Sequence, residues 1–220
     1  MVFVGHLDLL RYFQKAFRRS LLDIRYSQGY NPHQVMSFAM PLGVGVKSNG
    51  EYMDVTMNSV TSSKDFVEAL GAQMAEGVDI VSVVELDEDS KNAMTSVAGA
   101  SYYVDYREGY QPDFDFEKEF TKFMEQDKIL VIKKTKKSEK EMDLKEHIHD
   151  YRVTGNQAYV LVDAGSVVNI KPNQIMEAFY ESLGKECGAF TFVYTRDDLF
   201  MRESEEGPFL SLLAAGKEFE

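Results

Sequence analysis

The sequence predicts an α+β fold, and three observations support this prediction. Short segments in which polar and apolar residues alternate, as in strands, occur between amphipathic segments with helical spacing. Hydrophobic residues make up 44% of the 220 residues and charged residues 27%, which is typical of a folded globular chain. No apolar run approaches the roughly 18–20 residues that span a bilayer. We therefore expect an α+β protein with no membrane segment, and the single cysteine, Cys187, fits the reducing cytoplasm.

The first half of the chain is predicted to contain a helix, two strands, a second helix and a third strand. Within residues 5–21, Leu7, Leu10, Phe17 and Leu21 recur at helical spacing, which places them on one face. Alternation, turn residues and a capping Ser or Thr mark the later elements. These are strand pieces at 24–26 and 35–38, a strand over 52–57, a helix from 61 or 62 to about 75, and a strand over 78–84.

The second half begins after the polar, acidic segment 87–96, which is the predicted domain boundary. Its predicted elements are a strand at 101–107, a helix at 114–126, strands at 129–134 and 158–162, a helix at 172–185 and a strand at 189–195. This order of strand, helix, two strands, helix and strand is that of the split βαβ or ferredoxin-like unit. The first half has the same order if its first strand is missing or reduced to residues 1–4.

We therefore predict two tandem ferredoxin-like units, over 1–90 and 97–220, with the first lacking or shortened in its first strand. The second unit carries a highly charged hairpin excursion at 133–150 and a C-terminal tail after Arg202. The missing strand would leave an unpaired sheet edge, through which two copies of the chain could form a homodimer.

Basic side chains are concentrated near the start of the chain. The protein has a net charge of −12, but residues 1–50 contain six basic and two acidic side chains and so have a net charge of +4. Within the first predicted helix, Arg11, Lys15, Arg18 and Arg19 have the spacing of one helical stripe. Such a stripe is either a solvated face or a surface that binds phosphate groups, and the sequence leaves both interpretations open.

The chain contains few residues that could perform catalysis or hold a metal. Cys187 is its single cysteine, so the chain cannot supply the thiolates of an iron–sulfur cluster, and we expect no cofactor. His6 and His33 could act as acid and base in a metal-independent ribonuclease, but His6 could equally cap the first helix and His33 could brace a turn. His147 and His149 lack further well-spaced zinc ligands, so we predict no metal site.

Several motifs near the start of the chain occur in the order and spacing of a known bacterial family. They are GHLDLLR at 5–11, the pair Arg18-Arg19, YSQGYNPH at 26–33, SFAMPLGVG at 37–45 and GEYMD at 50–54. Through these motifs the segment 5–54 resembles the radical-SAM-linked (radical SAM-associated) family of bacterial proteins of unknown function. Members usually carry a first strand before GHLD, in agreement with the strand missing from the predicted first unit.

The resemblance implies a partner. Family members are encoded beside, or fused to, a B12-binding radical SAM protein, and no activity is established for the domain itself. The chain also resembles the RAMP proteins, which include CRISPR repeat-processing endoribonucleases. It shares with them two ferredoxin-like units, a histidine near the first helix and a GxxPH turn. This second resemblance makes RNA the leading candidate ligand.

The leading interpretation is a non-catalytic RNA-binding accessory module that presents an RNA, either tRNA or rRNA, to a radical SAM partner. We expect no activity from the chain on its own. Two alternatives stay open: a protein-interaction adaptor for the radical SAM protein, or a metal-independent endoribonuclease that uses His6 or His33. In the leading interpretation Arg11, Lys15, Arg18 and Arg19 contact phosphates, and Tyr26, Gln28, Tyr30, Asn31 and His33 contact splayed bases.

Overall fold

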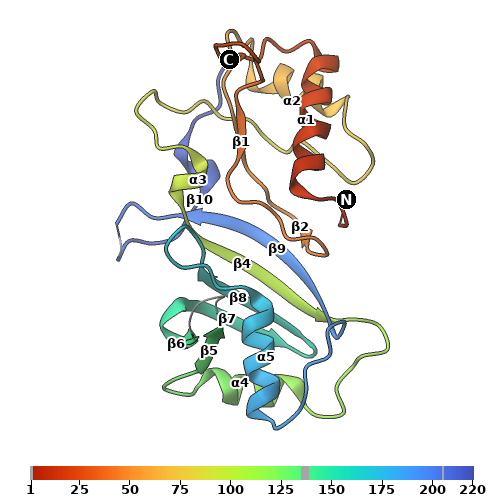
Figure 1. The fold of residues 1–220 in the computed structure, drawn as a ribbon, viewed down its shortest axis with the longest axis vertical. Coiled ribbons are helices and arrows are strands. Elements are labelled where there is room, and N and C mark those ends of the chain that lie inside the picture. The colour runs from red at the N-terminus through yellow and green to blue at the C-terminus, as the bar shows by residue number, and fades with distance from the viewer. Residues whose placement is uncertain (1, 135–138, 205) are drawn as a thin grey trace. The chain divides into compact units, whose positions relative to one another are not determined.

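The computed structural model of the protein describes residues 2–134, 139–204 and 206–220, and its mixed helices and sheets confirm the α+β class (Figure 1). The chain forms two compact units. Unit 1 comprises Met1–Gly45, Glu51–Val97 and Phe200–Glu220, and unit 2 comprises Val46–Gly50 and Ala98–Leu199. The predicted domains, 1–90 and 97–220, differ from these units because 200–220 belongs to unit 1 and 46–50 to unit 2.

Unit 1 contains two main helices and a short antiparallel ladder. Its elements are α1 (His6–Ser20), β1 (Met36–Phe38), β3 (Met53–Val55), α2 (Ser63–Gly71), α3 (Ala93–Ser96), β10 (Leu210–Ser211) and the 3₁₀ helix η2 (Leu212–Ala215). The rings of Phe17 on α1 and Phe66 on α2 are buried, with centroids 6.0 Å apart. β1 pairs antiparallel with β3, and Met36 and Val55 of this ladder pack against the same core. The predicted first helix is confirmed.

The predicted strand over 78–84 is wrong, because these residues form no strand. Ile80 and Val83 pack against the core of unit 1. The apolar side chains of this segment are therefore explained by their packing, although its backbone pairs with no strand. A strand needs a neighbouring strand, and the next residue, Glu85, forms only an isolated bridge with Lys217. The second helix ends at Gly71 instead of near 75, and residues 2–5 before α1 form no strand.

Unit 2 is built on an antiparallel sheet and two helices. Its elements are β2 (Lys47–Ser48), β4 (Val97–Tyr106), α4 (Phe116–Met124), β5 (Leu130–Lys134), β6 (Glu139–Asp143), the 3₁₀ helix η1 (Leu144–His147), β7 (Ile148–Thr154), β8 (Gln157–Asp163), α5 (Pro172–Ser182) and β9 (Phe192–Met201). The sheet has the order β9-β4-β8-β7, and β2 adds to β9 in parallel. Phe116 and Phe120 of α4 pack on Phe179 of α5, with ring centroids 5.5 Å and 5.3 Å from that of Phe179.

In unit 2 the strand that lies beside β8 is not the one predicted from the sequence. The predicted strand 129–134 is present as β5, but it pairs with β6 in a separate two-stranded sheet. β7, which was not predicted, lies beside β8 instead; its charged residues and its register shift between Ile148 and Asp150 obscure the alternation. β5 and β6 pair over Leu130–Asp143, which overlaps the predicted hairpin excursion at 133–150 only in part, and residues 135–138 lie outside the described residues.

The finer description, two tandem ferredoxin-like units, stays a prediction. In unit 2 a helix follows β4 and another follows β8, and the strand order β9-β4-β8-β7 is compatible with a split βαβ arrangement. In the described part of unit 1, β1 and β3 form a two-stranded sheet. A second split βαβ unit would need a larger sheet than this one. No helix in the described part of the chain is long and apolar enough to cross a membrane.

Candidate functional site

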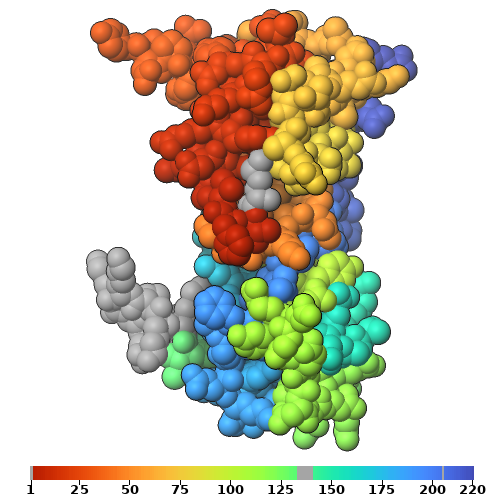
Figure 2. All heavy atoms as spheres, turned by 90° about the vertical axis from the view of Figure 1, so that its right-hand side faces the viewer, coloured from red at the N-terminus to blue at the C-terminus, as the bar shows by residue number. Residues whose placement is uncertain are grey.

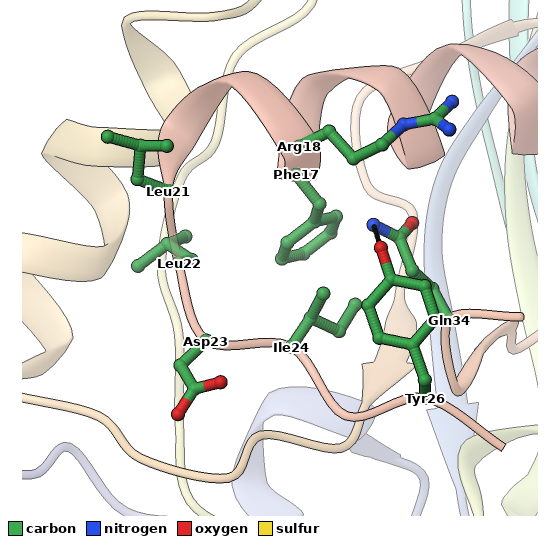
Figure 3. A pocket seen from close by; sticks show the side chains of 8 residues that line it. All are labelled: Phe17, Arg18, Leu21, Leu22, Asp23, Ile24, Tyr26 and Gln34. Atoms are coloured by element: carbon green, nitrogen blue, oxygen red, sulfur yellow. Dashed lines mark hydrogen bonds between the residues drawn. The ribbon is translucent and has the colours of Figure 1, made fainter. Parts of the chain in front are cut away.

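Unit 1 has a pocket of about 440 Å³ at the C-terminal end of α1 (Figure 3). This volume lies in the range of sites that hold small organic groups, which is about 300–1,000 Å³. The end of α1, the chain that follows it and the segment before β1 supply its walls. The lining residues are Phe17, Arg18, Leu21, Leu22, Asp23, Ile24, Tyr26 and Gln34.

The end of α1 shapes the pocket. Leu21 caps the helix with a left-handed backbone, at φ 60°, and it is the one non-glycine residue with a positive φ in the described chain. This conformation turns the chain sharply and leaves the Leu21 side chain 88% exposed. Isolated bridges from Ile24 to Met57 and from Tyr26 to Gln34 then fix the returning chain. Backbone pairing therefore fixes the pocket wall that the chain after α1 forms.

Gln34 places an amide group inside this pocket. The residue is only 4% exposed, and its Nε2 donates to the Tyr26 hydroxyl at 3.4 Å. Its Oε1 is buried and has no hydrogen-bond partner among the described residues. A buried polar atom without a partner costs about 1–3 kcal/mol, so native proteins usually satisfy such atoms with a ligand or a water molecule. Gln34 Oε1 is thus a buried acceptor that no described residue pairs.

The charges around the pocket are separated. Hydrogen bonds to Asp23 from Asn58 Nδ2, at 2.9 Å, and from Ser59 Oγ, at 2.8 Å, lower the pKa of the Asp23 carboxyl and keep it ionised. The Arg18 side chain is exposed and has no hydrogen-bond partner among the described residues. Figure 3 shows the Arg18 guanidinium on the same side as the Gln34 amide, whereas the Asp23 carboxylate points away from that amide. The pocket therefore has a cationic and an anionic side.

The segment 27–33 forms a closed loop beside the pocket. Ser27 N donates to His33 O at 2.8 Å, His33 N donates to Ser27 Oγ at 3.1 Å, and Ser27 Oγ lies 2.9 Å from His33 Nδ1. These bonds close the base of the loop and leave Tyr30 fully exposed near its tip. Figure 2 shows this part of the chain, in red-orange, projecting from the body of unit 1.

Comparison with known protein families matches residues 1–172 to the family described as "Uncharacterized protein conserved in bacteria (DUF2344)". The chain belongs to this family. The match includes every residue that lines the pocket and the whole of the loop 27–33. A search of curated proteins found no match to the chain.

In this DUF2344 protein the predicted basic stripe is divided among different roles. Arg18 lines the pocket, whereas Arg11 forms an exposed ion pair with Asp8 at 3.1 Å. Arg19 donates to Gln73 Oε1 at 3.3 Å and to Gln73 O at 3.1 Å, which ties α1 to the chain after α2. Lys15 is exposed on α1. Arg18 and Tyr26 are the predicted RNA contacts that the fold brings together at the pocket.

The remaining predicted contacts lie in the loop or its base. Gln28, Tyr30 and Asn31 are exposed on the loop 27–33, and His33 is held by Ser27. The bonds to Ser27 agree with the interpretation of His33 as a brace for the turn. His6 begins α1 but does not cap it, since Gly5 is the N-cap residue. The His6 ring instead packs edge-on against Phe38, with centroids 5.5 Å apart.

The histidine pair of unit 2 shares one carboxylate. His147 Nδ1 lies 2.8 Å from Asp163 Oδ2, and His149 Nε2 lies 2.6 Å from Asp163 Oδ1. Among the residues that the structure describes, no three His, Cys, Asp or Glu side chains are arranged to hold a metal ion. Asp163, on β8, was not among the ligands considered for these histidines from the sequence.

The residues inside the pocket carry no clear functional pattern in the sequence. Phe17 and Leu21 were assigned to the apolar stripe of a helix, although both line the pocket. Gln34 follows His33 directly and carries no motif of its own. One signal was present: Gln34 lies next to the apolar strand piece 35–38, at a position where a polar side chain needs a partner.

Proposed function

We propose that the protein is a non-catalytic RNA-binding accessory protein that presents an RNA to a radical SAM partner enzyme. The observation that carries this proposal is the convergence of Arg18, Tyr26 and the unpaired amide oxygen of Gln34 on one pocket. A guanidinium favours phosphate, an aromatic ring favours a base, and an amide can hydrogen-bond a base edge. These three groups together suit an unpaired nucleotide.

The surroundings of the pocket support binding to a single strand. Arg11, Lys15 and Arg18 are exposed on α1 and give a nucleic-acid backbone cationic contacts. Tyr30 is fully exposed, which is unfavourable for an apolar ring in water and favourable for stacking on an unpaired base. The net charge of +4 in residues 1–50 concentrates phosphate attraction in a protein that is otherwise acidic.

The proposed partner rests on the motifs at 5–54, which resemble those of radical-SAM-linked proteins. A radical SAM enzyme needs an iron–sulfur cluster held by several cysteines. The chain has Cys187 alone, so the cluster would belong to the partner. The division of labour would then be that this chain holds the RNA and the partner performs the reaction.

The test is a titration of the full chain with fluorescent single-stranded RNA at several salt concentrations. We expect Arg11→Ala combined with Arg18→Ala to weaken binding and to flatten the slope of log K against log salt by roughly 0.7 for each phosphate that is no longer neutralised. The matched control is Lys118→Ala with Lys122→Ala, which removes the same charge from exposed positions of α4. The RNA is recovered after incubation with EDTA, so that metal-independent cleavage by His6 or His33 would be detected.

A folded Arg11→Ala, Arg18→Ala protein with unchanged RNA affinity would remove this proposal and favour the adaptor. One observation favours that second function: Phe3, Leu7 and Val44 are 80%, 65% and 64% exposed. A bond from Gly45 N to Val2 O, at 2.8 Å, holds the segments around Phe3 and Val44 together. The adaptor would bind the radical SAM partner through this apolar surface, and Val44→Asp would then reduce their co-purification.

A further inference from the structure

The hydrogen bond between Gln34 and Tyr26 determines what the pocket offers a ligand. Gln34 Nε2 donates to the Tyr26 oxygen, so the Tyr26 hydroxyl keeps its own hydrogen free to donate. Gln34 Oε1 is a free acceptor. Arg18 has only donors, and Figure 3 shows its guanidinium on the side of the Gln34 amide. The pocket therefore presents one acceptor accompanied by donors on two neighbouring side chains.

The complement of this pattern is an N–H donor between two acceptors. Adenine has it, since its amino group at N6 lies between N7 and N1, and uracil has it, since its N3–H lies between O2 and O4. Guanine places its N1–H between an acceptor, O6, and a second donor, N2. Cytosine places its amino group between N3 and a carbon. Adenine and uracil thus satisfy the pocket's acceptor and both donors, whereas guanine and cytosine leave one group unpaired.

The rest of the pocket suits a flat ring with a phosphate on one side. Phe17, Leu22 and Ile24 provide apolar contacts for a base. The ionised Asp23 repels a phosphate on its own side, whereas Arg18 attracts one on the other. These charges would orient a bound nucleotide with its backbone toward Arg18.

We propose that this pocket binds one unpaired adenine or uracil base of the RNA, read by Gln34 Oε1 with the Tyr26 hydroxyl and Arg18. This inference rests on the proposed function. It adds a preference for one hydrogen-bonding pattern, which phosphate contacts alone would not produce.

The experiment measures the affinity of the full chain for cytidine strands of about 12 nucleotides, with one central residue changed to adenosine, uridine or guanosine. We expect the adenosine or the uridine strand to bind about 10-fold more tightly than the all-cytidine strand, which corresponds to about one well-placed hydrogen bond. N6,N6-dimethyladenosine and N3-methyluridine remove the critical N–H. The methylated base that abolishes the gain identifies which base the pocket reads.

Two variants connect the preference to the pocket. Gln34→Leu replaces the amide with an apolar side chain of similar size and should abolish the gain. Tyr26→Phe removes only a hydroxyl from a residue that is 43% exposed, so it keeps the inference testable if Gln34→Leu fails to fold. The matched control is Tyr110→Phe in unit 2, a tyrosine that is 47% exposed.

The outcomes separate this inference from the proposed function. Equal affinity for all four strands, a preference for guanosine or cytidine, or a preference that persists in both pocket variants would overturn the base pocket and leave RNA binding in place. Absence of binding to every strand would overturn the proposed function as well.

Discussion

Gln34 illustrates, at the scale of single residues, which parts of the site a sequence pattern can predict. Arg18 and Tyr26 are predicted RNA contacts because a basic helical stripe and an aromatic turn are visible in the sequence. The role of Gln34 depends on its burial, and the bridge to Tyr26 that holds it joins residues on either side of the loop 27–33. The exposed cations and rings could therefore be predicted, whereas the buried acceptor required the tertiary structure.

Asp23 gives a pH-dependent prediction at the same scale. Its pKa is lowered in the folded protein by the hydrogen bonds from Asn58 and Ser59, so its contribution to stability is present above the unfolded pKa, about 3.9, and is lost as pH falls through the folded value. We expect Asp23→Ala to lower the unfolding midpoint in urea at pH 7 and to have a smaller effect near pH 3.

The control for this prediction is Asp65→Ala on α2, an exposed residue of unit 1. A difference between wild type and Asp23→Ala that stays constant from pH 7 to pH 3 would show that the bonds to Asn58 and Ser59 do not depend on the charge of Asp23.

At the scale of elements, helices were predicted better than strands for a physical reason. The periodicity that marks α1, α4 and α5 is local, because each residue bonds within its own helix. A strand depends on a partner that is distant in sequence. The segment 78–84 has apolar residues but no ladder partner, whereas β7 has charged residues and a bulge but pairs along β8. Composition alone therefore predicts a strand at 78–84, where there is none, and misses the strand β7.

Gly50 gives a prediction for the pairing of β2 with β9. A methyl group on Gly50 would lie 2.8 Å from Asp197 O, and the neighbouring Asn49 N donates to Arg196 O at 2.9 Å. We expect Gly50→Ala to lower the free energy of unfolding by about 1–3 kcal/mol, because β9 must shift to make room. Urea denaturation measures this change.

Gly71 supplies a control of opposite sign. It is the last residue of α2, and nothing lies within 4 Å of a methyl group added there. We expect Gly71→Ala to stabilise unit 1 by about 0.5–1 kcal/mol, as alanine does in helices. If Gly50→Ala left the free energy of unfolding unchanged, β9 would be able to move away from the added methyl group without a loss of stability.

At the scale of the whole molecule, unit 1 is assembled from three stretches of chain. Its last stretch forms backbone bonds with residues far away in sequence. Ser63 N, at the start of α2, donates to Phe219 O at 2.9 Å, and Phe219 N donates to Ser63 Oγ at 3.0 Å. The predicted C-terminal tail is therefore part of unit 1, although it contributes no residue to the pocket.

We expect deletion of residues 208–220 to destabilise unit 1. Hydrogen exchange at the amides of α2 should become faster, because this deletion removes the bonds at Ser63 and the bridge between Glu85 and Lys217. The control is Lys217→Ala with Glu218→Ala, which changes exposed side chains but keeps the backbone bonds. Unchanged exchange in the deleted protein would contradict a structural role for the C-terminal residues.

The division of unit 1 also has a consequence for the newly made chain. Synthesis proceeds from the N-terminus, and domains generally fold as they leave the ribosome. Almost all of unit 2, Ala98–Leu199, is complete before Phe200–Glu220 has been translated, whereas unit 1 needs those last residues. Unit 1, which contains the pocket, would therefore be completed only after almost all of unit 2 has been synthesised.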